Sequence, residues 1–269
     1  MYLYPEIFIF LALIGCAAGL LAGLLGIGGG IITVPALLLT FYLLGVSSPY
    51  LMHVALGTSL GAMVFTSAFS ALAHFRKKGV NWYFFRTIAP GIIIGAIFGA
   101  LIADNLTSGK LQMICGFAEC LVGFYFLFPQ KSHGLEGDHQ KPKSVVFLVP
   151  IGICIGAISS ILGIGGGIIT VPILVAFGVH FRNAISTSAV LGFLIASIGA
   201  ISYLSLGLGK ETVPGSIGYL YLPGFFIIGF FSSLMASFGA KLAYILPVNI
   251  LRKVFAVVLI IIGFNMIFK

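Results

Sequence analysis

A ten-residue glycine motif that occurs twice is the part of this sequence best suited to chemistry. GIGGGIITVP stands at 26–35 and again, letter for letter, at 163–172. So many glycines favour irregular backbone, because each costs about 1 kcal/mol relative to alanine within a helix. Thr33 and Thr170 then read as N-caps of restarting helices, with the proline of each copy in the first turn. Because a helix start presents free N–H groups and the positive end of its dipole, each copy predicts an anion site.

Glycines also have other uses, and two of them bear on this motif. They let crossed helices approach closely, an interpretation that stays open for the two motifs. We favour it for two series spaced by four residues, Gly15, Gly19 and Gly23, and Gly91, Gly95 and Gly99. A dinucleotide-binding loop is excluded, because its third glycine would be Ile31 and no acidic residue follows about 20 positions later.

Hydroxyl pairs follow each glycine motif at the start of the next long apolar segment. They are Thr58-Ser59 in the first half and Thr187-Ser188 in the second. These hydroxyls could donate to an oxyanion without the cost of burying a charge. The alternative is that they hydrogen-bond between helices or back to the carbonyl four residues earlier.

Glu119 is the one acidic residue near the centre of a long apolar segment, 110–128. A carboxyl group within a membrane is costly and is a functional hypothesis by default, here the exchange of a proton. Its counterpart in the second half is Leu259, so it lies outside any symmetric arrangement. His53 and Arg182 precede the two Thr-Ser pairs and would either attract anions at two entrances or anchor helices at the membrane surface.

The composition shows what must position these residues. Of the 269 residues, 60% are hydrophobic and 7% are charged, with a mean hydropathy of +1.19. Soluble domains carry about 25% charged residues, so we expect an all-α polytopic membrane protein. Ten apolar runs are present: 7–25, 31–44, 51–73, 82–103, 110–128, 144–162, 168–178, 183–206, 217–240 and 250–268. Because a helix needs about 20 residues to cross the hydrocarbon core, and 31–44 and 168–178 are short, we expect eight to ten membrane segments.

Several classes of function are excluded or disfavoured. The net charge of +8 reflects membrane topology rather than nucleic-acid binding. All four cysteines lie in apolar runs and none has a partner at zinc-ligand spacing, so we expect no metal and no cofactor. There is no grouping of catalytic residues, and the protein is not expected to be an enzyme.

The two halves of the chain repeat each other. We expect a first transmembrane repeat at 1–128, a polar linker at 129–143 and a second repeat at 144–269. With the basic loop at 76–78 in the cytoplasm, eleven basic residues lie inside and three outside. Each half has five segments, or three full crossings if the short arms at 26–35 and 163–172 are re-entrant. Both numbers are odd, so the second repeat is inverted, the linker is cytoplasmic and both termini lie outside. Inverted repeats are typical of transporters, with the substrate near the repeat interface.

The double motif resembles a known family. Two GIGGGxxxVP motifs, each followed by an A-x-x-T-S segment, are similar to the sulfite exporter TauE/SafE family over nearly the whole chain. The resemblance implies a secondary transporter of the prokaryotic inner membrane that moves small sulfur-containing oxyanions, such as sulfite or organosulfonates, usually outward. It also implies which residues line the path: Gly28, Gly29, Gly30, Thr33, Pro35, Thr58, Ser59, Gly165, Gly166, Gly167, Thr170, Pro172, Thr187 and Ser188.

Together these features predict a secondary active transporter that works by alternating access. Its partners would be a small anionic substrate and the lipid bilayer, and no nucleic acid. The sequence holds no ATP-binding motif, and a proton gradient is the favoured driving force because Glu119 can titrate. The alternatives are an anion channel with the same site and, behind it, a membrane-embedded enzyme. The oligomeric state stays open.

Overall fold

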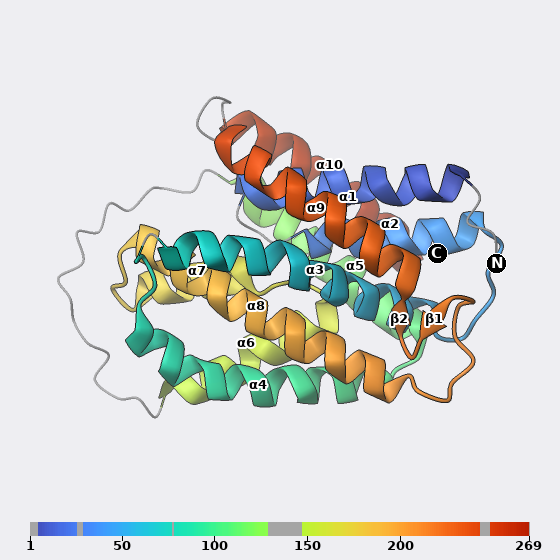
Figure 1. Cartoon of the computed structure of the whole chain (residues 1–269), viewed down its shortest axis with the longest axis horizontal. Coiled ribbons are helices and arrows are strands. Elements are labelled where there is room, and N and C mark those ends of the chain that lie inside the picture. Colours follow the sequence, from blue (N-terminus) through green and yellow to red (C-terminus); the bar gives the residue numbers. More distant parts are fainter. Residues whose placement is uncertain (1–4, 26–28, 77, 129–146, 243–247, 269) are drawn as a thin grey trace.

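The computed structural model describes residues 5–25, 29–76, 78–128, 147–242 and 248–268. Within these ranges the chain forms ten α-helices and one short β-hairpin (Figure 1). The helices are α1 (Pro5–Leu25), α2 (Gly30–Leu43), α3 (Leu51–Arg76), α4 (Trp82–Asp104), α5 (Ser108–Leu127), α6 (Leu148–Leu162), α7 (Gly167–Ala176), α8 (Phe181–Leu206), α9 (Leu222–Leu242) and α10 (Val248–Phe268). Each helix falls on one of the ten apolar runs, so the helical prediction is confirmed. The expected linker at 129–143 lies outside the described residues.

The hairpin is the one exception to the helical prediction. Strand β1 (Ser216–Ile217) pairs antiparallel with β2 (Leu220–Tyr221), where the apolar run at 217–240 predicts the start of a helix. Gly218 between the strands has φ +56°, a left-handed conformation that glycine adopts without steric cost. The chain therefore turns back on itself before α9 begins at Leu222.

Length and apolarity identify the molecule as an integral multi-pass membrane protein. Among the described residues, six helices are long and apolar enough to cross a membrane, namely α1, α3, α4, α5, α8 and α9. Shorter apolar helices lie in α2, α6, α7 and α10. Large apolar side chains such as Phe98, Phe117 and Ile261 are exposed on the outer surface, which lipid accommodates and water does not.

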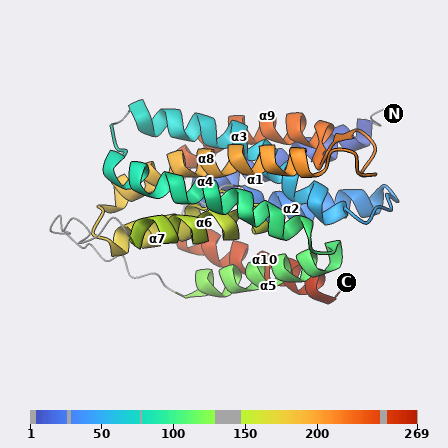
Figure 2. The same ribbon diagram turned by 90° about the horizontal axis from the view of Figure 1, so that it is seen from below.

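The two halves of the chain interlock rather than form separate bodies. Helix α4 of the first half packs along α6 of the second, and α9 of the second half packs along α1 of the first. Helices α3 and α8 also pack together, and Figure 2 shows α5 and α10 side by side at one edge of the bundle. Every major interface between these helices therefore joins the two halves.

Glycines permit the close approach of these helix pairs. A Cβ on Gly95 of α4 would overlap the carbonyl of Ile153 in α6, and one on Gly19 of α1 would overlap the carbonyl of Ser232 in α9. The packing role expected for these spaced glycines is confirmed at both positions. Backbones in direct contact provide the van der Waals packing that holds helices together in lipid.

The repeated motifs interrupt the helices, as expected. Helix α6 ends at Leu162, and α7 begins at Gly167. Between them Gly163 and Gly166 have φ values of +66° and +68°, which other residues rarely adopt. In the first half α1 ends at Leu25 and α2 begins at Gly30.

The predicted threonine caps are wrong. The N-caps are Gly29 and Gly166, so both helices start three residues before Thr33 and Thr170. Each glycine carbonyl already accepts helical hydrogen bonds, in the first copy from the N–H groups of Ile32 and Thr33 at 3.2 Å. The prolines consequently lie at the sixth helical residue rather than in the first turn.

The glycine packing can be tested with a pair of variants. Gly95→Ala places a methyl group against the Ile153 backbone, which cannot move aside as a side chain can. We expect it to lower the free energy of unfolding by about 1–3 kcal/mol, as overpacked cores do. Gly109→Ala is the control, because a Cβ there has no neighbour within 4 Å. Thermal unfolding of the purified proteins in detergent compares them, and equal stabilities would contradict the packing role.

Candidate functional site

The two copies of the glycine motif meet inside the molecule. A Cβ on Gly30, at the start of α2, would overlap the carbonyl of Gly163 and would lie 2.9 Å from Sδ of Met63 in α3. Both glycines are buried. We call the segments 29–30 and 163–166 the glycine centre. Its two parts are 133 or more residues apart in the sequence and are in contact in the fold.

Helices α3 and α8 enclose the glycine centre from two sides. Ser59 of α3 donates a buried hydrogen bond of 3.0 Å from its hydroxyl to the carbonyl of Gly163. A Cβ on Gly192 of α8 would lie 2.8 Å from the carbonyl of Gly165, and one on Gly165 would lie 2.5 Å from Cε of Met63. Irregular backbone at membrane depth is tolerated only where protein or a water-filled cavity surrounds it, and here protein does so.

The two threonines of the Thr-Ser pairs make equivalent contacts in the two halves. The hydroxyl of Thr58 accepts a hydrogen bond of 2.9 Å from the N–H of Tyr221, the residue before α9. The hydroxyl of Thr187 accepts one of 2.9 Å from the N–H of Asn81, the residue before α4, and donates to the carbonyl of Asn183. Each threonine thus holds the start of a helix from the other half, as the interhelical alternative expects.

The other described residues of the predicted path lie on α2, α7 and α8. Gly167 begins α7, Thr170 and Ser188 are buried in α7 and α8, and Thr33 and Pro35 are buried in α2. Pro172 is exposed. Gly28 lies outside the described residues.

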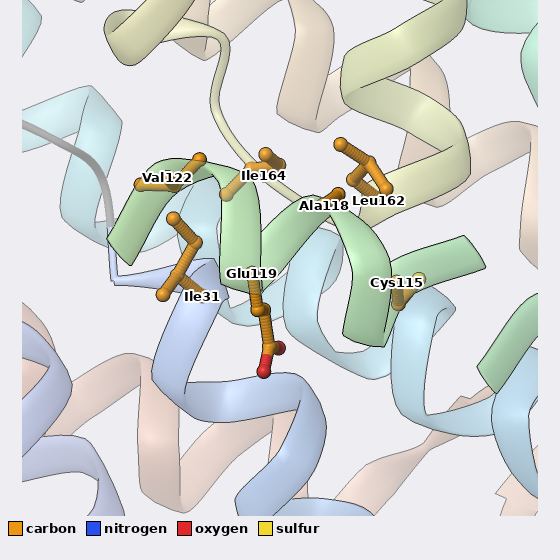
Figure 3. A pocket seen from close by; sticks show the side chains of 7 residues that line it. All are labelled: Ile31, Cys115, Ala118, Glu119, Val122, Leu162 and Ile164. Carbon is orange, nitrogen blue, oxygen red and sulfur yellow. The ribbon is translucent and has the colours of Figure 1, made fainter. Parts of the chain in front are cut away.

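Glu119 lies in a small pocket that reaches both parts of the motif. The pocket is lined by Ile31, Cys115, Ala118, Glu119, Val122, Leu162 and Ile164. Figure 3 shows these side chains, which come from α2, α5, α6 and the second glycine turn. Ile31 belongs to the first motif copy and Ile164 to the second. Glu119 is 6% exposed, and within the described residues its Oε2 has no hydrogen-bond partner.

The two entrance candidates lie at opposite ends of the α3–α8 pair. Arg182 is exposed at the start of α8. His53 near the start of α3 is buried, and its Nε2 lies 3.0 Å from the carbonyl oxygen of Ala103. Its ring packs against Tyr219 of the segment between α8 and α9, with ring centroids 5.0 Å apart. The structure thus places His53 in the packed interior of one end.

A charged network that was not predicted from the sequence lies at the same end of the α3–α8 pair as His53. Lys210 forms an ion pair of 2.5 Å with Asp104, and the hydroxyl of Tyr219 donates a 2.7 Å hydrogen bond to the same carboxylate. Burial, and then the bond to Asp104, raise the pKa of Tyr219. The only signal in the sequence was the position of both charges at the ends of apolar runs, which does not indicate pairing.

Comparison with known protein families gives a match over nearly the whole chain. The family model described as sulfite exporter TauE/SafE matches residues 11–266. The chain belongs to the TauE/SafE family. The doubled glycine motif, which the structure brings together in one buried centre, is thus a feature of a TauE/SafE protein.

Relatives of this TauE/SafE protein are described as probable membrane transporter proteins. One from Haemophilus influenzae is 36% identical over 96% of this chain and 97% of its own length. Another from Bacillus subtilis, YunE, is 28% identical over 97% of this chain and 98% of its own length. No solved structure matches the chain. The resemblance inferred from the motifs is therefore confirmed, and membrane transport is the function of this family.

The threonine contacts predict a loss of stability in two variants. Thr58→Val leaves the buried N–H group of Tyr221 without its partner, which costs about 1–3 kcal/mol, and Thr187→Val does the same, at a smaller cost, to the half-buried N–H group of Asn81. Thr87→Val is the control, because that hydroxyl bonds only within its own helix, to the carbonyl of Tyr83. Thermal unfolding in detergent measures the difference. If all three variants are equally stable, the threonines do not hold the two halves together.

Proposed function

We propose that this protein is a secondary active transporter that exports small sulfur-containing oxyanions, sulfite or organosulfonates, by alternating access. The observation that carries the proposal is the contact between the two motif copies at Gly30 and Gly163 in the buried interior. A transported substrate must be reachable in turn from both sides of the membrane. A binding site shared by two equivalent halves is suited to that requirement.

An anion would be held by N–H groups and hydroxyls at the glycine centre. The first N–H groups of α2 and α7 have no acceptor within their own helices, and the helix dipoles favour negative charge there. The segments that form the centre contain no lysine or arginine. Neutral donors bind an anion without burying a permanent positive charge, which would be costly when the site is empty.

The two halves would be inverted repeats in the inner membrane, with the linker 129–143 in the cytoplasm and both termini outside. Helices α1 to α5 of the first half correspond in order to α6 to α10 of the second. Exchange of the halves therefore maps the α4–α6 pair onto the α9–α1 pair, and it maps the α3–α8 pair and the α5–α10 pair each onto itself. The start of α3 lies beside the end of α8, because the rings of His53 and Tyr203 both contact Tyr219. Equivalent helices that run in opposite directions are what an inverted duplication produces, and this supports the proposal.

Glu119 would couple transport to protons. Its pocket is lined by one isoleucine from each motif copy, so a change in the carboxyl group's protonation would act directly on both motif copies. The partner helix α10 contributes Leu259, fully buried, at the equivalent position of the other half. One carboxyl group beside the centre gives one proton site for each transport cycle.

Flux into liposomes tests the transport proposal. The purified protein is reconstituted and offered sulfite, sulfate, thiosulfate, several sulfonates and small carboxylates, each with and without a pH gradient. We expect saturable uptake of sulfur oxyanions, counterflow against internal substrate, and stimulation by the gradient. Ohmic currents without saturation would instead establish an anion channel.

The role of Glu119 is tested by one isosteric variant. Glu119→Gln keeps the side-chain shape and removes the titratable proton, so we expect counterflow of sulfite to persist while the stimulation by a pH gradient is lost. Glu211→Gln is the control, since that side chain is exposed between α8 and α9. A Glu119→Gln protein that is still driven by the pH gradient would remove the coupling role.

A further inference from the structure

The two copies of the motif have identical sequences but different surroundings. In the first copy Gly29 packs against the backbone and Cβ of Ala18 in α1, and Gly30 packs against the carbonyl of Gly163. In the second copy the residue equivalent to Gly29 is Gly166, and the nearest neighbours of a Cβ there would be the ends of side chains, Ile195, Ser159 and Thr170. Side-chain ends can rotate away from an incoming ligand, whereas backbone cannot, so the space beside Gly166 can open locally where the space beside Gly29 cannot.

The backbone conformation of the N-cap glycine also differs between the two copies. Gly29, the N-cap of α2, has φ −60°, and Gly166, the N-cap of α7, has φ +68°. In the first copy the hydroxyl of Thr33 donates to the Gly29 carbonyl at 3.0 Å, the usual bond of a threonine within a helix. The hydroxyl of Thr170, at the same place in the second copy, has no partner within the described residues although it is 1% exposed.

A second unpartnered hydroxyl lies beside the same turn. Ser159 of α6 is fully buried, and within the described part of the chain its Oγ has no hydrogen-bond partner. A Cβ on Gly166 would lie 3.1 Å from this Oγ and 3.5 Å from Oγ1 of Thr170. Two hydroxyl groups without partners among the described residues therefore lie beside Gly166, on the side where a Cβ atom would project. Buried polar groups are almost always hydrogen-bonded, so two exceptions at one place need an explanation.

The first half of the chain has no equivalent of this pair. The residue that corresponds to Ser159, counted back by the same offset that relates the motifs, is Ala22. Helix α3 carries Met63 five residues after Thr58, where α8 carries Gly192 five residues after Thr187. The differences remove a donor from the first copy and place a large side chain between the two turns.

We propose that the anion is bound by the second glycine turn, with the hydroxyls of Ser159 and Thr170 as its donors, and that the first turn serves as the surface against which it packs. This inference rests on the proposed transport function and specifies its site. Two hydroxyls and the free N–H groups at the start of α7 offer separate donors to separate acceptor atoms. The site therefore favours anions with several oxygens, such as sulfite, over a single-atom anion such as chloride.

Four variants in two matched pairs test the assignment. Thr170→Val is compared with Thr33→Val, and Ser159→Ala with Ser160→Ala. Ser160 is equally buried and also has no partner among the described residues, but its Oγ faces Gly199 of α8 rather than Gly166. Thr170→Ser keeps the hydroxyl and should behave like the wild type. Sulfite-dependent thermal shifts in detergent and the KM of sulfite uptake into liposomes are measured for each protein.

We expect Thr170→Val and Ser159→Ala each to need about tenfold more sulfite for the thermal shift and to raise KM about tenfold, because each loses a hydrogen bond to a charged ligand. Without sulfite they should unfold at the wild-type temperature or above, because they remove an unsatisfied buried group. Thr33→Val should change the affinity for sulfite much less than Thr170→Val does, Ser160→Ala should keep the wild-type affinity, and chloride should produce no shift.

Three outcomes would overturn the assignment. Equal changes within each matched pair would show that the second turn is not the binding half. A loss of stability without sulfite in Thr170→Val and Ser159→Ala, with wild-type affinity for it, would give these hydroxyls a structural role. If no anion of the panel raises the unfolding temperature of the wild-type protein or is transported by it, the transport proposal and this site assignment both fail. If only the matched pairs fail to differ, the site assignment fails and the transport proposal stands.

Discussion

The fold depends on a requirement of the lipid environment, that every backbone polar group be satisfied without water. The glycine centre departs from helical structure at 163–166, so its carbonyls and N–H groups need partners from elsewhere in the protein. The hydroxyl of Ser59 supplies one of them to Gly163. The rest of the architecture follows, because the turns can exist only when long helices cover them on all sides.

The exchange of helices between the halves provides that cover. Because α4 packs on α6 and α9 on α1, neither half can close its own core without the other. Glycines at these interfaces bring the backbones into contact, and the hydroxyls of Thr58 and Thr187 fix the starts of α9 and α4. The same contacts that stabilise the bundle hold the two motif copies together, so stability and the geometry of the site have a common origin.

Near-symmetry accounts for both the shared and the unequal features of the centre. Duplication gives each half a glycine break and a threonine that reaches into the other half. The halves also differ: Ser159 of the second half corresponds to Ala22 of the first, and Glu119 of the first half corresponds to Leu259 of the second. Two halves with the same framework and different polar residues would provide one binding site rather than two, with the carboxyl group of Glu119 beside it.

The sequence alone determined the membrane environment, the ten helices to within a few residues, and the duplication, because apolar runs and an identical motif are local patterns. It misplaced the helix starts at Thr33 and Thr170, since which carbonyl accepts the first helical bond depends on the conformation of the preceding glycine. Only the tertiary structure decided that Gly30 meets Gly163, that Asp104 pairs with Lys210, and that Thr170, unlike Thr33, has a hydroxyl without a partner among the described residues. Such pairings join residues far apart in the chain, and identical sequences such as the two motifs differ only through what surrounds them.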